Sequence, residues 1–504
     1  MSQDQTSARR KWQHATLIVT VVFVSYSYFY QGGGWNQNSR FDLVRAMLDE
    51  HTLRIDSYHQ NTEDKAVFQG HYYSDKAPGI ALMALPAVAL SRPVLRVVGL
   101  DPHSPGGLLA QSYVATIAAV GLPSAFAAGC LFVLAQKLGA SSQASLFAAL
   151  SMSLATPLWP WSSIFFAHAV VGALLLFAFA AAIQLRECSP GWPEFAWGLL
   201  LGLTAGWATV SEYPAAPASA MLALLALTLV WSRGEHSRWR IIFGVSAGAL
   251  ACVAVLMTYQ YAAFGSPFAM GYTHYESGAF PWMARGFLGI TFPRLDVLFK
   301  LLLGLHLGLF WLAPVTVAAL FGLRTLWRQG DRRIAAAVLA IPLYYWLFNG
   351  AFSGWHGGWS YGPRYMGAGV ALLCVALAPA WNYANRKWQR VMAALAVWGF
   401  ALSLMAVATT AQPPQSYRIP LTELIVPSFV HGHLSINQVS MLTPAEASHT
   451  RAAFNLGELA GLHGLSSLIP LVLFWIVIAV LWALTTKGEQ RGVESSADSA
   501  TNHP

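Results

Sequence analysis

The chain has 504 residues, of which 56% are hydrophobic and only 10% are charged, and its formal net charge is +8. Soluble domains carry about 25% charged residues, so this composition excludes a soluble globular protein. Apolar runs of about 20 residues recur along the chain, and each is long enough to cross a bilayer. The sequence therefore predicts an all-α polytopic membrane protein, with a single membrane domain over residues 1–486.

The excess of positive charge does not indicate nucleic acid as a partner. The basic residues lie mainly in short connections between apolar runs, where membrane topology accounts for them. The 4 cysteines form no spaced pair, which argues against a disulfide or a zinc site. We assign no metal site and no certain cofactor, and a requirement for a divalent metal ion stays open.

The first apolar run follows the basic stretch "ARRKWQH" and ends in aromatic residues without a small-residue cleavage site, so we expect an uncleaved first helix. In chain order, the apolar runs predict about twelve spanning helices. They cover residues 14–30, 109–136, 142–158, 162–185, 194–211, 214–232, 240–262, 301–324, 332–350, 363–382, 390–410 and 464–486.

The run at 78–100 is ambiguous, because it contains two internal prolines and two arginines. Treating it as a helix that lies at the membrane surface places more than half of the basic residues in short connections on the side of the N-terminus, which matches the inside-positive rule. Treating it as a span reverses every later connection. We therefore expect both termini in the cytoplasm and 78–100 outside the bilayer.

This topology leaves long segments on the outer face and a polar end in the cytoplasm. The outer segments are a large first periplasmic loop at 31–108 with juxtamembrane helices, further loops at 263–300 and 351–362, and a last loop at 411–463. Residues 487–504 are polar and are predicted to be a disordered cytoplasmic tail.

The first outer loop concentrates the acidic residues. Asp42, Asp56, Asp64 and Asp75 are candidate bases, since a carboxylate near apolar surface can remove a proton from a hydroxyl. Lys76, in "GHYYSDKAPG", is a compact cation suited to a phosphate. A solvated loop in which these charges neutralise one another is the structural alternative.

The stretch "NGAFSGWHGGWSYGPRY" at 349–365 is the second candidate site. Its glycines let the backbone approach a ligand closely. Trp355, Trp359 and Tyr361 offer flat faces for a sugar or a lipid, and Arg364 can form bidentate bonds to a phosphate. An interfacial aromatic belt anchored by an arginine is the alternative.

Other outer turns add polar residues to the same face. The turns "IFFAHA" and "VSEYPAA" carry His168 and Glu212. Each of these residues is as well explained by a packing role as by contact with a ligand. The loop 263–300 contributes His274, Glu276 and Arg294. The cytoplasmic connections contain neither a P-loop nor a dinucleotide fingerprint and are too short for a nucleotide-binding domain, so a donor used outside is expected to be a lipid-linked phosphate.

Several of these motifs together resemble bacterial membrane glycosyltransferases of the GT-C superfamily. The resemblance extends over most of residues 15–480 and rests on "HYYSDKAPG", "TPLWPWSSIFFAHA", "SEYPAA", "FGSPF" and "GGWSYGPRY". The chain is similar to phospholipid-carrier-dependent members, and more distantly to lipid A aminoarabinose transferases and protein O-mannosyltransferases. The resemblance implies a GT-C-like helical bundle, a polyprenyl-phosphate sugar donor and inversion at the sugar carbon.

The resemblance also assigns residues. The stretch "SDKAPG" matches the acid-Lys-Pro-Pro stretch of the aminoarabinose transferases except at Gly79, so Asp75 and Lys76 take the acid and phosphate-contacting positions. The acidic pair of those relatives falls on Asn36 and Gln37 here, which removes the usual base. Asp64 is the preferred replacement, followed by Asp56 and Asp42.

Taken together, the sequence predicts transfer of a sugar from a polyprenyl phosphate to a hydroxyl of a lipid, glycan or protein, on the periplasmic face of a bacterial inner membrane. Lys76, Arg364 and Arg294 are expected to bind the donor phosphate. The sugar and acceptor pocket is expected to include Tyr72, Tyr73, His168, Glu212, His274, Glu276, Trp355, Trp359 and Tyr361. The alternatives are a secondary transporter or flippase, and a ligase or polymerase of lipid-linked glycans.

Overall fold

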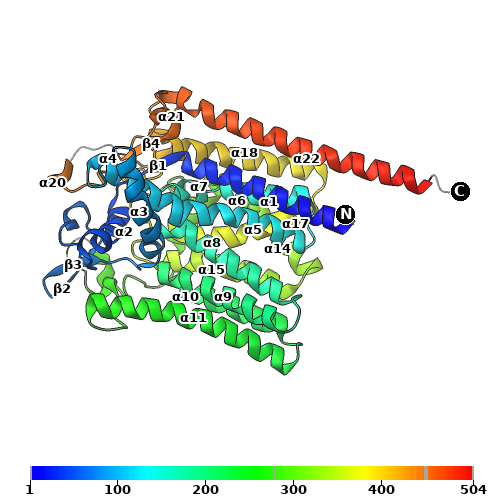
Figure 1. The fold of residues 1–504 in the computed structure, drawn as a ribbon, viewed down its shortest axis with the longest axis horizontal. Helices are drawn as coiled ribbons and strands as arrows, with labels where there is room; N and C mark the ends of the chain where they lie inside the picture. Colours follow the sequence, from blue (N-terminus) through cyan, green and yellow to red (C-terminus); the bar gives the residue numbers. More distant parts are fainter. Residues whose placement is uncertain (1–2, 276–277, 279, 438, 448–451, 502–504) are drawn as a thin grey trace.

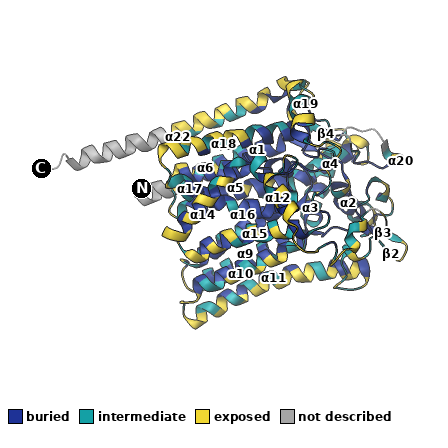
Figure 2. Ribbon diagram, turned by 180° about the vertical axis from the view of Figure 1, so that it is seen from behind, coloured by how far each residue is buried: buried dark blue, intermediate teal, exposed yellow. Residues whose placement is uncertain are grey.

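A computed structural model describes residues 3–501, apart from 276–277, 279, 438 and 448–451. Long helices run side by side, and the loop segments gather at one end of the bundle, while both chain termini lie at the other end (Figure 1). The helices buried in the middle of the bundle are surrounded by helices whose outer faces are exposed and apolar, as expected for a bundle in lipid (Figure 2).

The bundle is formed by helices from both halves of the chain. The first half contributes α1 (Gln3–Ser27), α4 (Pro105–Thr116), α5 (Leu122–Lys137), α6 (Ser142–Leu154), α7 (Leu158–Ser162), α8 (Ala167–Leu185), α9 (Trp192–Ser211), α10 (Ala215–Val230) and α11 (Glu235–Phe264). The second half contributes α12 (Leu295–Leu303), α13 (Leu309–Leu312), α14 (Ala318–Gln329), α15 (Arg332–Ala351), α16 (Gly367–Leu373), α17 (Leu377–Asn382), α18 (Arg386–Thr409) and α22 (Ile469–Thr501).

Eight helices in the described part of the chain are long and apolar enough to span a membrane. Among them, α4 and α5 join through a π-turn into one 33-residue helix, Pro105–Lys137. Helices α6, α9 and α10, which are not among these eight, pack against α5 or α8 inside the same bundle. Each predicted span contains helix, so the all-α polytopic architecture predicted from the apolar runs is confirmed.

The predicted single helix at 301–324 is wrong. The chain instead forms α12, a short α13 and then α14, which begins only at Ala318. Gly304 and Gly308 lie in the first break and Pro314 in the second. Glycine and proline both disfavour a helix interior, and proline also removes a backbone donor. The glycine and proline residues of this run therefore indicate its helix ends better than its apolar composition does.

Helix α3 (Gly79–Val97) is continuous despite Pro86 and Pro93. Its 19 residues are long and apolar enough to span a membrane. It packs against α2, against the first part of the long helix Pro105–Lys137 and against α9, and Figure 1 shows it beside α2 at the loop end of the bundle. Its position therefore favours the predicted surface helix, and its exposed apolar residues, such as Leu90 and Val97, suit contact with lipid.

Close helix packing in the lower part of Figure 1 depends on glycine. Helices α9 and α11 meet through Gly198 and Gly202 on one side and Gly244 and Gly248 on the other. A Cβ atom added at Gly202 would overlap the carbonyl oxygen of Val245, so no larger residue fits without separating the helices. Small residues of this kind are the usual contact points between helices in membranes.

The loop end contains short helices and two small antiparallel sheets. No strand was predicted from the sequence. The first sheet pairs β1 (Phe29–Gln31) with β4 (Ala453–Asn455), and the second pairs β2 (Lys65–Phe68) with β3 (His71–Ser74). The remaining helices there are α2 (Trp35–Arg45), α19 (Val426–Val430), α20 (Pro444–Ala447) and α21 (Leu456–Leu459). Pairing of β1 with β4 joins the first and last outer loops.

Helix α22 extends to Thr501, into the segment predicted to be a disordered tail. Residues 487–501 contain no proline, and they include glutamate, glutamine, arginine and alanine, which favour helix. Polar composition alone therefore did not indicate the end of the helix.

Candidate active site

A cavity of about 850 Å³ opens at the loop end of the bundle, between the first outer loop and the ends of several helices. Its charged lining residues are Arg40, Asp64, Lys76, Glu212 and Arg364, and two histidines, His168 and His356, also line it. Its aromatic lining residues include Tyr272, Tyr275, Trp282, Tyr344, Phe352 and Trp359. A concave site that combines aromatic walls with a few charged groups is the usual form of a small-molecule site.

The β2–β3 hairpin places the acid and the lysine at this cavity. Its turn residues, Gln69 and Gly70, both have positive φ, at 52° and 81°, as a type I′ turn requires. Strand β3 ends at Ser74, so the next two residues leave the sheet together. Asp75 is fully buried, whereas Lys76 reaches the cavity wall.

Lys76 lies between two carboxylates. Its Nζ atom is 2.9 Å from Oδ2 of Asp75 and 3.1 Å from Oδ1 of Asp64. The Tyr275 hydroxyl donates to the same Asp75 oxygen over 2.5 Å. Asp64, but not Asp75, is part of the cavity lining. The structure thus joins Asp64, Asp75 and Lys76, which the sequence singled out separately, into one buried cluster.

The electrostatics of this cluster follow from burial and pairing. Burial raises the pKa of the Asp75 carboxyl, and the nearby ammonium of Lys76 opposes that rise. Burial alone disfavours the charged ammonium, but Asp64 and Asp75 outweigh it and raise the pKa of Lys76 above its ordinary value. Lys76 is therefore charged, and its charge is largely offset by its own neighbours.

Arg364 differs from Lys76 because no carboxylate pairs with it among the described residues. The glycine-rich loop before it folds back, and a Cβ atom at Gly357, which has φ +72°, would lie 3.0 Å from Nε of Arg364. The guanidinium lies 4.8 Å from the centre of the Phe166 ring and 5.2 Å from that of Tyr365. Its Nε atom is buried without a hydrogen-bond partner. This geometry leaves an unneutralised cation on the cavity wall.

Arg40 is a cavity residue that the sequence analysis missed. It lies in α2, is 4% exposed, and donates to the carbonyl oxygen of Ala77 over 3.0 Å and to Oδ1 of Asn36 over 3.1 Å. In the sequence, Arg40 stands in the polar first half of an amphipathic surface helix. An arginine at such a position is equally typical of a residue that faces solvent. Only the folding of Ala77 against α2 shows that the guanidinium faces inward.

His168 and Glu212 form a pair on the cavity wall. His168 is the second residue of α8 and Glu212 directly follows α9, so the packing of these two helices brings the side chains together. Nδ1 of His168 is 2.5 Å from Oε1 of Glu212, and the side chains are 6% and 15% exposed. The sequence placed both residues in the pocket but did not predict their contact.

Two candidate bases lie away from the cavity lining. Asp42 lies in α2 and is fully buried, 3.7 Å from Arg45 and 3.3 Å from the side-chain amide of Asn61. Asp56 accepts from the backbone N–H of Tyr72 over 2.6 Å and is 2.8 Å from the His71 ring. These contacts give both carboxylates a role in holding the first loop together.

The stability of the protein is expected to depend on pH through Asp42. Burial raises the pKa of its carboxyl from 3.8 to about 8, against the opposing charge of Arg45. A raised pKa in the folded state means that the stabilisation is complete below the unfolded value and is lost as the pH rises to about 8. We expect the unfolding temperature in detergent to fall over this range, and Asp42→Asn to lessen the fall. Asp56→Asn, at a half-exposed site, is the control, and an unchanged pH profile in Asp42→Asn would contradict the assignment.

Several other predicted site residues also lie outside the cavity lining. Arg294 is half exposed and pairs with Asp296, and Tyr361 is buried against Leu312 and Leu402. The remaining ones pack against neighbouring side chains: Tyr72 on His59, Tyr73 and His274 on Phe264, and Trp355 under Lys300. Glu276 lies outside the described residues. Trp359, by contrast, lines the cavity and is 40% exposed.

No group of three or more histidine, cysteine or acidic side chains is placed to hold a metal ion within the described part of the chain. The charged cavity residues instead occur as the Lys76 cluster, the His168–Glu212 pair and the two arginines. The arrangement can bind an anion, and it offers both a carboxylate and an imidazole as proton acceptors.

The helical bundle, the large first outer loop and the cavity between them define a polytopic membrane protein with a binding site at the loop end. More particularly, the chain has a GT-C-like fold. It matches ArnT from Cupriavidus metallidurans bound to undecaprenyl phosphate with a TM-score of 0.50 and 13% identity, covering 94% of this chain and 71% of that one.

Two further solved structures were matched at lower TM-scores. ArnT from the same organism in the apo state gives 0.49 at 13% identity, with 85% of this chain and 74% of that chain covered. The Archaeoglobus fulgidus oligosaccharyltransferase in complex with zinc and sulfate gives 0.44 at 12% identity, with 86% and 58% covered. No protein-family model and no curated protein matches the sequence.

Proposed function

We propose that the protein is a glycosyltransferase that moves a sugar from a polyprenyl-phosphate donor to a hydroxyl acceptor. The observation that carries the proposal is that Lys76 and Arg364, which lie far apart in the sequence, line one cavity with an aromatic wall. Arg364 has no carboxylate partner among the described residues, so an anion is the ligand that fits beside it.

The proposed chemistry uses the cavity as a fixed electrostatic environment. The donor phosphate binds at Arg364, with Lys76 and Arg40 lining the same cavity. As the bond between the sugar and the phosphate breaks, negative charge develops on the phosphate, and cations already in position stabilise it without reorganising. Aromatic faces such as Trp359 suit a sugar ring. Attack by the acceptor opposite the phosphate inverts the sugar carbon.

The class of donor is supported by fold similarity. The ArnT structure with which this chain shares its fold contains undecaprenyl phosphate. Trp35 and Phe287 line the cavity and are exposed, so they suit contact with lipid tails. The acceptor is a lipid, a glycan or a protein.

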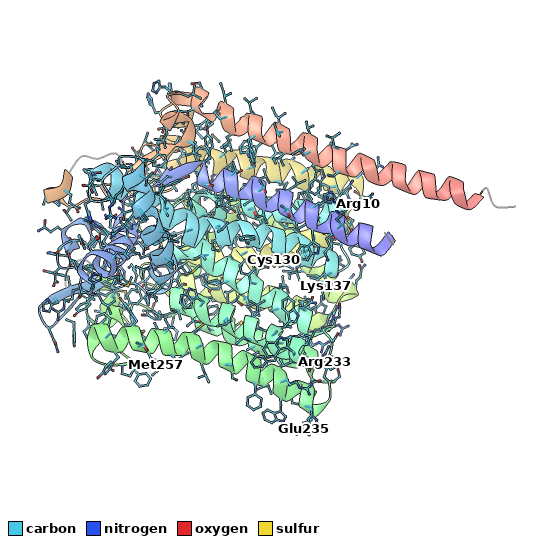
Figure 3. All side chains as sticks on the ribbon, viewed as in Figure 1. Arg10, Cys130, Lys137, Arg233, Glu235 and Met257 are labelled. Atoms are coloured by element: carbon cyan, nitrogen blue, oxygen red, sulfur yellow. The ribbon has the colours of Figure 1, made fainter. Side chains whose placement is uncertain are left out.

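The distribution of positive charge supports a proposal for the side of the membrane on which the cavity lies. Arg10, Lys137 and Arg233 lie at the end of the bundle where the N-terminus is found (Figure 3), opposite the first outer loop. Positive residues in short connections mark the cytoplasmic side. We therefore place both termini in the cytoplasm of a bacterial inner membrane and the cavity on the periplasmic face.

A secondary transporter fits the cavity less well. Transporters bind their substrates near the bilayer midplane, commonly where helices are interrupted. Here the charged cavity residues come from the first outer loop and from helix ends, as for Lys76, His168 and Glu212. A ligase or polymerase of lipid-linked glycans would use a similar site, and it differs in the product.

Incubation of the purified protein in proteoliposomes with a panel of polyprenyl-phosphate sugars and a membrane extract as the source of acceptor tests the proposal. We expect release of polyprenyl phosphate and an acceptor heavier by one sugar in mass spectrometry. Addition of a whole glycan block would indicate a ligase. Movement of sugar across the bilayer without any transfer would indicate a transporter and contradict the proposal.

A further inference from the structure

The His168–Glu212 pair has the geometry of an oriented base. Nδ1 of His168 is 2.5 Å from Oε1 of Glu212, so a neutral imidazole donates its Nδ1 proton to that carboxylate. Nε2 then carries the lone pair, and no described residue hydrogen-bonds to it, although both residues line the cavity. A carboxylate that fixes the tautomer of a histidine whose other nitrogen faces a substrate cavity is a recurring catalytic arrangement.

The acids of the first outer loop are less available for this role. Asp42 and Asp56 do not line the cavity, and Asp75 lies behind it with both oxygens buried or bonded. Asp64 does line the cavity, but one of its oxygens is 3.1 Å from the ammonium of Lys76, which offsets its charge. Asn36, at the position where related transferases carry an acid, cannot accept a proton and is engaged by Arg40.

We propose that His168 is the general base of the reaction and that Glu212 positions it, an assignment that rests on the proposed glycosyl transfer. Nε2 of His168 takes the proton of the acceptor hydroxyl while the acceptor oxygen bonds to the sugar carbon. The bond from that carbon to the phosphate oxygen breaks, and polyprenyl phosphate leaves with the electron pair. The imidazolium then loses its proton to water or to the leaving phosphate, which restores the base.

The surroundings of His168 fit a base that must stay neutral before it acts. The charged groups that line the cavity with it are Glu212 at the end of α9, Arg364 after the glycine-rich loop, Arg40 from α2, and Asp64 and Lys76 from the first outer loop. The two arginines disfavour a protonated resting imidazole, while Glu212 stabilises the imidazolium once the acceptor proton arrives. The ring is also held edge-on by Phe166 and Tyr365, at 5.8 Å and 5.3 Å between ring centres.

The test compares His168→Gln and Glu212→Gln with His71→Gln. His71 makes a similar imidazole–carboxylate pair with Asp56, at 2.8 Å, but outside the cavity lining, so it controls for the loss of such a pair. Removal of a general base costs about 10²–10⁴-fold in rate. We expect a loss of this size in His168→Gln, with the acid limb of the pH–rate profile abolished. Glu212→Gln is expected to lose about 10²-fold and to shift that limb, and His71→Gln to keep the wild-type rate and profile.

Binding of undecaprenyl phosphate, followed by native mass spectrometry, separates this inference from the proposed function and from misfolding. We expect the two cavity variants to bind it as the wild type does, and added imidazole to restore part of the transfer in His168→Ala. Full transfer with an unchanged pH profile in His168→Gln overturns the assignment of the base alone and returns the role to Asp64. A wild-type protein that neither binds undecaprenyl phosphate nor transfers sugar overturns the proposed function, and the assignment of the base with it.

Discussion

Replacing Lys76 with methionine is expected to destabilise the protein and abolish transfer at the same time. The ammonium is the shared partner of Asp64 and Asp75, at 3.1 Å and 2.9 Å, and all three residues are buried. Removing one partner of a buried ion pair costs about 3–5 kcal/mol, because the remaining charge has lost both water and its counter-ion. Thermal unfolding in detergent measures the loss of stability, and the transfer assay measures the loss of activity.

The pH dependence of the stability of Lys76→Met shows whether the loss of stability comes from an unpaired Asp75. Burial raises the pKa of Asp75, and without Lys76 the opposing attraction disappears. The carboxyl then takes up a proton more readily in the folded state, so its stabilisation is present at acid pH and is lost as the pH rises. We expect the deficit of Lys76→Met to grow from acid to neutral pH and to shrink when Asp75→Asn is added. A deficit that is constant across pH, or unaffected by Asp75→Asn, would show that Lys76 is not the counter-ion.

The architecture followed from the sequence because membrane spans require long apolar runs, and those runs predicted helices such as α8, α15 and α18. The break between α12 and α14 was missed because leucines on both sides of Gly304 and Gly308 kept the local hydropathy high. Strand pairing of β1 with β4 joins residues at opposite ends of the chain, and no local pattern records such a contact.

The sequence predicted individual residues of the candidate site but not the contacts between them. The unusual sequence context of Lys76 and Arg364 indicated both residues, and both line the cavity. The sequence did not indicate which acid pairs with Lys76, because Asp42 and Asp64 both belong to the same polar loop. Only the folded path of that loop places Asp64 at Lys76 and Asp42 at Arg45. Likewise, the contact between His168 and Glu212 depends on how two distant helices pack.

Arg364 is expected to be the main binding residue for the donor phosphate. Arg364→Ala is expected to lower transfer by about 10²–10³-fold, the usual effect of removing one preorganised donor to a developing negative charge. Unlike Lys76, Arg364 has no carboxylate partner among the described residues, and its Nε atom is buried without a hydrogen bond. Its loss therefore removes an anion site without leaving a buried acid unpaired, and we expect the unfolding temperature to change much less than in Lys76→Met.

Arg294→Ala is the matched control, since Arg294 is half exposed and pairs with Asp296 outside the cavity lining. We expect it to retain wild-type transfer and wild-type affinity for undecaprenyl phosphate. Arg364→Lys discriminates further: a lysine restores the charge but not the planar, bidentate geometry, so it is expected to recover only part of the rate. If Arg364→Ala binds undecaprenyl phosphate and transfers sugar as the wild type does, the phosphate is bound elsewhere, and Arg40 becomes the cation to test, because it lines the same cavity and contacts the backbone next to Lys76.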